Sequence, residues 1–212
     1  MLKKIVFCIL FSQLALVSCK DKTANPDNPE VATETLMPIS KISFTHDTIA
    51  KNVSIKINGD LFTNYLYDGQ TPKPILYPII TKSGKTVTRG FPYEPRANER
   101  VDHPHHAGHW MNYGDVNGLD FWNNSYAIPT TEKDKYGTII HQKVTKLDPD
   151  NGILSIKAVW QAPNGTNLLE EATTFTFSED GDSRVIDRST TLTALEKVTF
   201  KDNKEGMFAI RV

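Results

Sequence analysis

Four of the six histidines in this 212-residue chain fall within seven residues, in the segment Asp102-His103-Pro104-His105-His106-Ala107-Gly108-His109. Imidazole is the side chain best suited to exchanging protons or holding a metal ion near neutral pH. No other segment of the sequence concentrates such groups in this way, so we expect the functional site to be built on this one.

Two kinds of chemistry suit this segment. General acid–base catalysis needs one or two imidazoles with a carboxylate within reach, which His103, His105, His106 and Asp102 supply. Alternatively, the same three histidines hold a divalent metal such as Zn, Fe or Mn, with open positions for a substrate. A third interpretation has the rings bonding loop carbonyls and holding the loop in shape. No fixed ligand spacing such as His-Glu-x-x-His decides between them, and the identity of a cofactor stays open.

The histidines lie in a long irregular insert, residues 92–122, and such loops on a rigid sheet commonly carry function. Aromatic rings there can stack on a sugar, and a guanidinium can bind its oxygen atoms. The competing interpretation places the tryptophans in the core of the loop and its arginines in ion pairs with Asp102 and Glu99. If the aromatic rings and arginines of the insert do bind a sugar, the candidate substrate-binding residues are Arg96, His109, Trp110 and Trp122.

The elements that must position this loop follow a β pattern from residue 39 onward. Short runs rich in Val, Ile, Thr and aromatic residues alternate with turn residues, and no long stretch has helical periodicity. We therefore predict an all-β domain over residues 39–212, a large antiparallel β-sandwich. Because the chain stops inside an apolar strand, we expect the domain to be truncated at its C-terminus. The expected strands are 53–57, 75–81, 86–88, 137–147, 153–160, 171–177, 185–195 and 207–212.

The N-terminus has the pattern of an export signal. In residues 1–18, two lysines precede an apolar run that is too short to span a membrane. Leu16-Val17-Ser18-Cys19 resembles a bacterial lipobox, in which Cys19 takes the lipid; an ordinary signal peptide or a single anchor helix is the alternative. Residues 19–38 are polar and contain three prolines, which predicts a flexible tether. We expect an outer-envelope lipoprotein, periplasmic or at the cell surface, that contacts the membrane through its anchor.

The composition of the chain limits both its classes of binding partner and the bonds that can stabilise its fold. The formal net charge of −1 gives no electrostatic reason to expect nucleic acid. The only two cysteines, Cys8 and Cys19, fall in the signal and at the lipidation site, so no pair is left for a disulfide. Stability must therefore come from burial, for which the mature chain is long enough.

Several blocks around the histidines make the chain resemble the DUF6807 family, whose members are often labelled methane oxygenase PmoA family proteins. The resemblance covers residues 75–212. It implies secreted or lipid-anchored proteins of Bacteroidota and Planctomycetota, a setting of glycan degradation, and a sandwich reminiscent of galactose-mutarotase-like proteins. It implies no catalytic residues. The blocks are Tyr77-Pro78, Thr81–Lys85, Thr88–Pro92, Asp102–His106, Gly108–Trp110, Asp115–Gly118, Asp120–Trp122 and Lys204–Val212.

The methane label does not transfer to this chain. The membrane methane monooxygenase subunit is a bundle of spanning helices, whereas this sequence has a β pattern and no spanning segment after its signal. We expect a protein that acts on carbohydrate or a sugar derivative through the histidine-rich site. The alternatives are a non-catalytic glycan-binding lipoprotein and, ranked last, a metal-dependent oxygenase.

Overall fold

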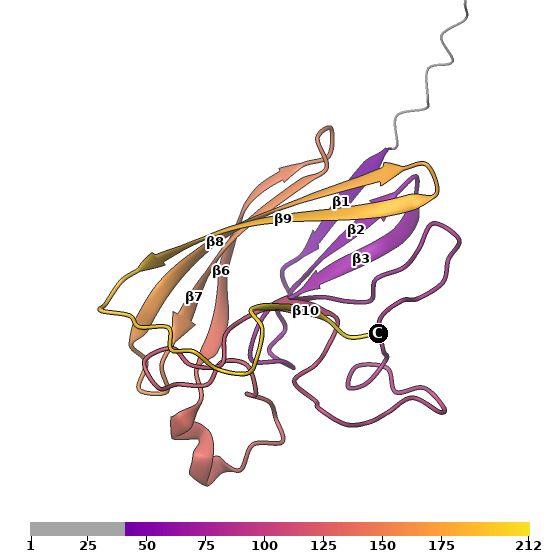
Figure 1. The fold of residues 1–212 in the computed structure, drawn as a ribbon. Coiled ribbons are helices and arrows are strands. Elements are labelled where there is room, and N and C mark those ends of the chain that lie inside the picture. The colour runs from indigo at the N-terminus through magenta and orange to yellow at the C-terminus, as the bar shows by residue number, and fades with distance from the viewer. Residues whose placement is uncertain (1–40) are drawn as a thin grey trace, which may run out of the picture. The chain divides into compact units, whose positions relative to one another are not determined.

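Two antiparallel sheets make up the fold of residues 41–212, which are the residues that the computed structural model describes (Figure 1). The predictions made for the signal segment 1–18, for Cys19 and for the tether 19–38 lie outside these residues. The six-stranded sheet has the order β1 (Ile42–Asp47), β2 (Asn52–Ile57), β3 (Asp60–Leu66), β4 (Ile75–Leu76), β5 (His109–Met111) and β10 (Phe208–Ile210). The four-stranded sheet has the order β6 (Thr138–Asp148), β7 (Ile153–Gln161), β8 (Asn167–Asp180) and β9 (Ser183–Ala194).

The two sheets pack face to face around one core. Strand β7 alternates buried and half-buried residues along its length, as a strand does when one face of its sheet is covered. Across the interface, the ring of Phe62 on β3 meets that of Phe177 on β8 edge-on, with centroids 5.9 Å apart. The rings of Tyr65 on β3 and Phe175 on β8 also meet across the interface, tilted to each other with centroids 6.0 Å apart. The predicted antiparallel β-sandwich is confirmed.

Most expected strands are present; β6, β7 and β9 lie within two residues of their predicted bounds, β8 extends several residues beyond 171–177 at both ends, and residues 86–88 form no strand. The expected strand 75–81 is much shorter than predicted, because only Ile75 and Leu76 pair as β4. Pro78, two residues beyond Leu76, has no backbone N–H to give to a sheet. Beyond it a single bridge, Ile80 to Thr86, survives. Within residues 41–212, no helix has the length and hydropathy needed to cross a bilayer.

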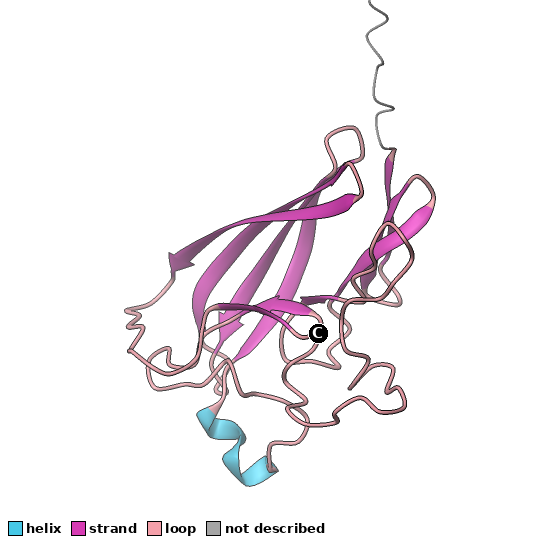
Figure 2. Ribbon diagram, turned by 45° about the vertical axis from the view of Figure 1, so that its right-hand side comes forward, coloured by secondary structure: helices cyan, strands magenta, loops and turns pink. Residues whose placement is uncertain are grey.

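Residues 77–137 run mostly as loops, so the predicted insert 92–122 is the middle of a longer irregular region (Figure 2). The region contains the short strand β5 and one 3-10 helix, η1 (Thr130–Lys135). Strand β5 ties the histidine segment into the six-stranded sheet, because it pairs with β4 on one side and β10 on the other. Gly108 precedes it with a φ of +61°, and a Cβ there would lie 2.3 Å from the Leu76 carbonyl oxygen. Only glycine fits this close approach.

Candidate functional site

The histidine segment is folded around one buried guanidinium, that of Arg89. Its Nη1 donates to the carbonyl oxygens of Arg100 at 3.1 Å and Asp102 at 2.9 Å, and to the Asp102 carboxylate at 2.7 Å. Its Nη2 donates to the carbonyl oxygens of His103 at 3.1 Å and His106 at 2.9 Å. The Arg89 side chain is only 3% exposed. Arg89 therefore fixes the path of the segment.

Asp102 and His103 form a carboxylate–imidazole pair at the surface of this segment. His103 Nδ1 lies 3.1 Å from Asp102 Oδ2, and the His103 side chain is 54% exposed. Burial opposes ionisation of Asp102, but the hydrogen bond with His103 and the charges of Arg100 and Arg211 outweigh it, so the pKa of the carboxyl lies below its ordinary value. A carboxylate on Nδ1 favours the tautomer that carries its proton there. Nε2 of the exposed ring is then free to accept a proton.

The backbone of His103 is strained. Its φ is +47°, in the left-handed region that non-glycine residues rarely adopt and that costs about 1–2 kcal/mol. Two hydrogen bonds to its carbonyl oxygen, from Arg89 and from the amide of His106 at 2.9 Å, hold it there. Strain that the surroundings over-determine is common at functional sites. The resulting turn brings His103 back toward the two histidines that follow.

The rings of His103, His105 and His106 gather into one cluster. His103 and His106 are stacked, with centroids 5.1 Å apart and planes 6° apart. His105 meets His106 nearly edge-on at 4.2 Å. Burial, with the neighbouring imidazoles and the charge of Lys73, lowers the pKa of His105 to about 3 and that of His106 to about 4. Both rings are therefore neutral at pH 7.

His109 does not join this cluster. Successive residues of a strand point to opposite faces of the sheet, so on β5 His109 and Trp110 face opposite ways. The buried His109 ring lies against Phe208, 4.4 Å between centroids, and its Nδ1 is 3.0 Å from the Ala209 carbonyl oxygen. Burial, with the charge of Arg188, lowers its pKa to about 4. The prediction that His109 binds substrate beside the other histidines does not fit this placement.

Trp110 and Trp122 form the floor beneath the cluster. They are 2% and 5% exposed, so neither ring offers an open face for a sugar to stack on. His106 stacks over Trp110 at 5.2 Å. The contacts favour the core interpretation of both tryptophans over the prediction that they bind substrate. The buried residues that pack with them are Ile75, Tyr77 and Ala107.

Arg96 is engaged within its own turn. Its Nη1 lies 2.9 Å from Glu99 Oε1 and donates to the carbonyl oxygen of Thr88 at 3.3 Å. Glu99 in turn accepts the Gly90 amide at 2.7 Å. These contacts favour the ion-pair interpretation of Arg96 over its predicted role in substrate binding.

The three clustered imidazoles do not form a metal-ligand set. Among residues 41–212, no group of three or more His, Cys, Asp or Glu side chains is arranged to hold a metal ion. Nitrogen lone pairs lie in the ring plane, so the parallel rings of His103 and His106 direct them along separate planes instead of toward one point. His103 also has its Nδ1 engaged by Asp102. The prediction that His103, His105 and His106 bind a metal therefore does not fit the geometry.

Lys73 lies beneath the cluster and was missed by sequence reasoning. Its Nζ donates to the His105 carbonyl oxygen at 2.8 Å and lies 5.4 Å from the centre of the Trp110 ring. The side chain is 2% exposed, and burial lowers its pKa to about 7 although the charge of Asp120 opposes the shift. Pro72 and Pro74 on either side of it indicate a rigid extended segment. They do not indicate its hydrogen-bond partner, His105, which lies 32 residues further along the chain.

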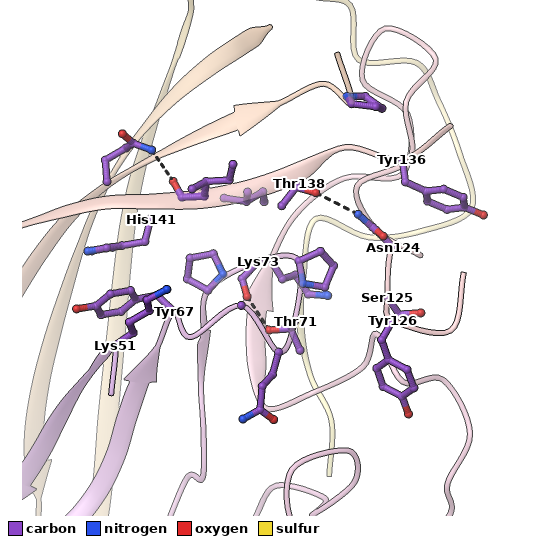
Figure 3. Close-up of a pocket in the computed structure, with 18 of the residues that line it drawn as sticks. Lys51, Tyr67, Thr71, Lys73, Asn124, Ser125, Tyr126, Tyr136, Thr138 and His141 are labelled. Carbon is purple, nitrogen blue, oxygen red and sulfur yellow. Dashed lines mark hydrogen bonds between the residues drawn. The ribbon is translucent and has the colours of Figure 1, made fainter. Parts of the chain in front are cut away.

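Lys73 also lines a groove of about 720 Å³ (Figure 3). Figure 3 shows Tyr67 and His141 at one end of it and Tyr126 and Tyr136 toward the other. The rings of Tyr67 and His141 stack with centroids 4.0 Å apart. The volume falls in the range of small-molecule sites. The other polar side chains of the lining are Thr48, Lys51, Gln70, Thr71, Asn124, Ser125, Lys133, Thr138 and Gln142.

Comparison with known proteins identifies the family of this chain. The model of DUF6807, described as a family of unknown function, matches residues 52–212. The chain belongs to the DUF6807 family. The resemblance found in the sequence is thereby confirmed. The match spans Lys73, Arg89 and the whole histidine segment. No curated protein and no solved structure matches the chain.

In this DUF6807 protein the site can move a proton. One ring, that of His103, is exposed and oriented by a carboxylate, while two neutral rings and a buried indole pack behind it. Lys73 belongs both to the support of the cluster and to the lining of the groove. The groove and the histidines are thus neighbours through this residue.

Proposed function

We propose that the protein acts on a carbohydrate or sugar derivative by general acid–base chemistry, with the Asp102–His103 pair transferring the proton. The observation that carries the proposal is the 3.1 Å contact between Asp102 Oδ2 and Nδ1 of a half-exposed ring. A carboxylate in this position orients the ring and stabilises the imidazolium that forms when Nε2 takes a proton. The strained φ of His103, held by Arg89, supports a site that is built for this ring.

The groove, which Lys73 links to the histidine cluster although no histidine of the cluster lines it, has room for a ligand of sugar size. Its volume of about 720 Å³ suits one or two sugar units, since small-molecule pockets span roughly 300–1,000 Å³. Tyrosine faces such as those of Tyr67 and Tyr126 can pack on a sugar ring, and the amides of Gln70 and Gln142 can bond hydroxyl groups.

A panel of glycosides, free aldoses and sugar acids, offered to the purified protein, tests the proposal. His103→Asn is the decisive variant, because asparagine tolerates the left-handed backbone but cannot serve as the base. We expect it to abolish turnover, and Asp102→Asn to lower turnover by roughly 100-fold or more. Glu170→Gln, which removes a carboxylate from β8, is the matched control and should leave turnover unchanged. Undiminished turnover in His103→Asn would refute the proposal.

A non-catalytic glycan-binding protein is the second candidate. The observation that favours it is the groove itself, whose lining includes none of the clustered histidines. This function predicts that sugars bind without being converted, and that His103→Asn leaves their affinity unchanged. Titration of the wild type and the variant with the same panel distinguishes the two candidates.

We also propose that the protein is a lipoprotein of the outer envelope, periplasmic or at the cell surface, anchored through Cys19. The support is the basic start, apolar run and lipobox-like Leu16-Val17-Ser18-Cys19 of the sequence. Metabolic labelling with a fatty-acid analogue should mark the wild type in the membrane fraction, and Cys19→Ala should lose both label and membrane association. A labelled Cys19→Ala protein would contradict the anchor.

A further inference from the structure

The lining of the groove is positively charged without acidic groups to balance it. It contains Lys51, Lys73 and Lys133 but no Asp or Glu, and His141, whose pKa burial lowers to about 4, is neutral at pH 7. The whole chain is almost balanced, with 24 basic and 25 acidic residues. A groove with three lysines and no carboxylate is therefore a local departure from the composition of the chain.

None of the three lysines forms an ion pair with another residue of the described range. Lys133 donates from Nζ to the Ser125 carbonyl oxygen at 2.7 Å, whereas its neighbour Lys135, outside the groove, lies 3.5 Å from the Glu132 carboxylate. Lys51 is exposed at the rim. Lys51 and Lys133 are thus two ammonium groups without a paired anion, and Lys73 adds a third when it is protonated; an anion would complete such a site.

Lys73 adds a buried amine beneath this site. Its Nζ has one hydrogen-bond acceptor, the His105 carbonyl oxygen. Asp120 acts on it electrostatically, but the Asp120 carboxylate already accepts hydrogen bonds from the amides of Trp122 and Asn123 and from the Asn123 side chain. A buried cation without a paired anion is costly. Burial accordingly lowers the pKa of Lys73 to about 7, and an anion in the adjoining groove would favour its protonated form.

We propose that the groove binds an anionic saccharide of one or two units, whose carboxylate or sulfate group is held by Lys133 near Ser125, while Lys51 at the Tyr67 end and the buried Lys73 add positive charge. The proposal names the substrate class of the function proposed above and rests on it for the sugar. Recognition of the anion rests on the three lysines alone. Tyr67, stacked on His141, is placed to pack against the sugar ring.

Isothermal titration calorimetry of the full chain tests the proposal with three probes: glucuronate, glucose 6-sulfate and neutral glucose. We expect at least one anionic sugar to bind about tenfold or more tightly than glucose, because a hydrogen bond to a charged group contributes more than one between neutral groups. The tighter of the two identifies carboxylate or sulfate as the group recognised. Equal binding of all three, or no binding of either anion, would overturn the proposal.

Matched lysine variants locate the binding. Lys133→Gln should weaken the anionic sugar about tenfold and leave glucose unchanged. Lys135→Gln, from the same short helix but outside the groove, should change neither. Because Lys133 also supports the Ser125 carbonyl, Lys51→Gln serves as a second variant with no such contact. Anion affinity that survives both groove variants would place the anion elsewhere and sink the proposal.

The same titrations in His103→Asn separate this proposal from the proposed function. Lysine-dependent binding of the anion without turnover of any sugar by the wild type leaves the groove assignment standing and removes the catalytic function. Turnover that depends on His103 but is unchanged when the groove lysines are replaced leaves the catalytic function standing and removes the groove assignment.

Discussion

Replacing Arg89 by methionine tests what holds the histidine segment in place. The guanidinium donates to four backbone carbonyl oxygens, of Arg100, Asp102, His103 and His106, and is almost fully buried. At roughly 1 kcal/mol net for each hydrogen bond, these four contribute about 4 kcal/mol to the free energy of unfolding. In a domain of this size 1 kcal/mol shifts Tm by about 2–4 °C, so Arg89→Met should lower Tm by about 8–16 °C.

Thermal unfolding followed by circular dichroism measures the effect, and Arg100→Met is its matched control. Arg100 contacts the same carboxylate of Asp102 at 3.1 Å, but its side chain is 80% exposed. Exposed ion pairs contribute little, so its Tm should change by less than about 3 °C. Arg89→Lys keeps the charge without the planar fork and should lie between the two. Equal Tm values for Arg89→Met and Arg100→Met would refute the reasoning.

Three further predictions concern the framework of the site. Lowering the pH from 7 to about 4.5 should reduce the free energy of unfolding by about 3–5 kcal/mol. The reason is that buried His105 and His109, with pKa values of about 3 and 4 in the fold, take up protons on unfolding. Urea unfolding at the two pH values measures this change, and a free energy of unfolding that does not depend on pH would contradict it. Glu171→Ala should destabilise the protein by about 3–5 kcal/mol, since it leaves the buried Arg188 unpaired. Glu170→Ala breaks an exposed pair with Lys157 and should cost at most about 1 kcal/mol. Similar urea midpoints for the two variants would argue against this difference between the buried and the exposed pair. Gly108→Ala should lower Tm more than Gly118→Ala, because both have positive φ but only Gly108 has the Leu76 carbonyl oxygen where a Cβ would lie; the reverse order in thermal melts would be inconsistent with the close approach.

The four-stranded sheet could be predicted because its signals are local. Strands β6 and β7 meet at the turn sequence Asp148-Pro149-Asp150-Asn151-Gly152, and β7 and β8 alternate apolar and polar residues. The six-stranded sheet was harder, because β4, β5 and β10 are two or three residues long and pair across large separations in the chain. Such short strands leave no periodicity to detect.

The gathering of histidines in one segment could be seen in the sequence, but the arrangement of their rings could be predicted only in part. An extended segment places His103 and His105 on one side, with His106 apart unless the chain bends; the left-handed φ of His103 supplies that bend. The opposite orientation of His109 follows from a strand that the sequence did not reveal. Lys73 and Arg211 reach the site by contacts with distant residues, which no local pattern shows.

Nitrogen-15 NMR of the His103 ring most directly tests the claim that Asp102 prepares this imidazole for proton transfer. With the carboxylate 3.1 Å from Nδ1, the neutral ring should carry its proton on Nδ1 and leave Nε2 unprotonated, and Asp102→Asn should shift the tautomer population toward Nε2–H. A wild-type ring protonated on Nε2, or a population that Asp102→Asn leaves unchanged, would contradict the role assigned to the pair.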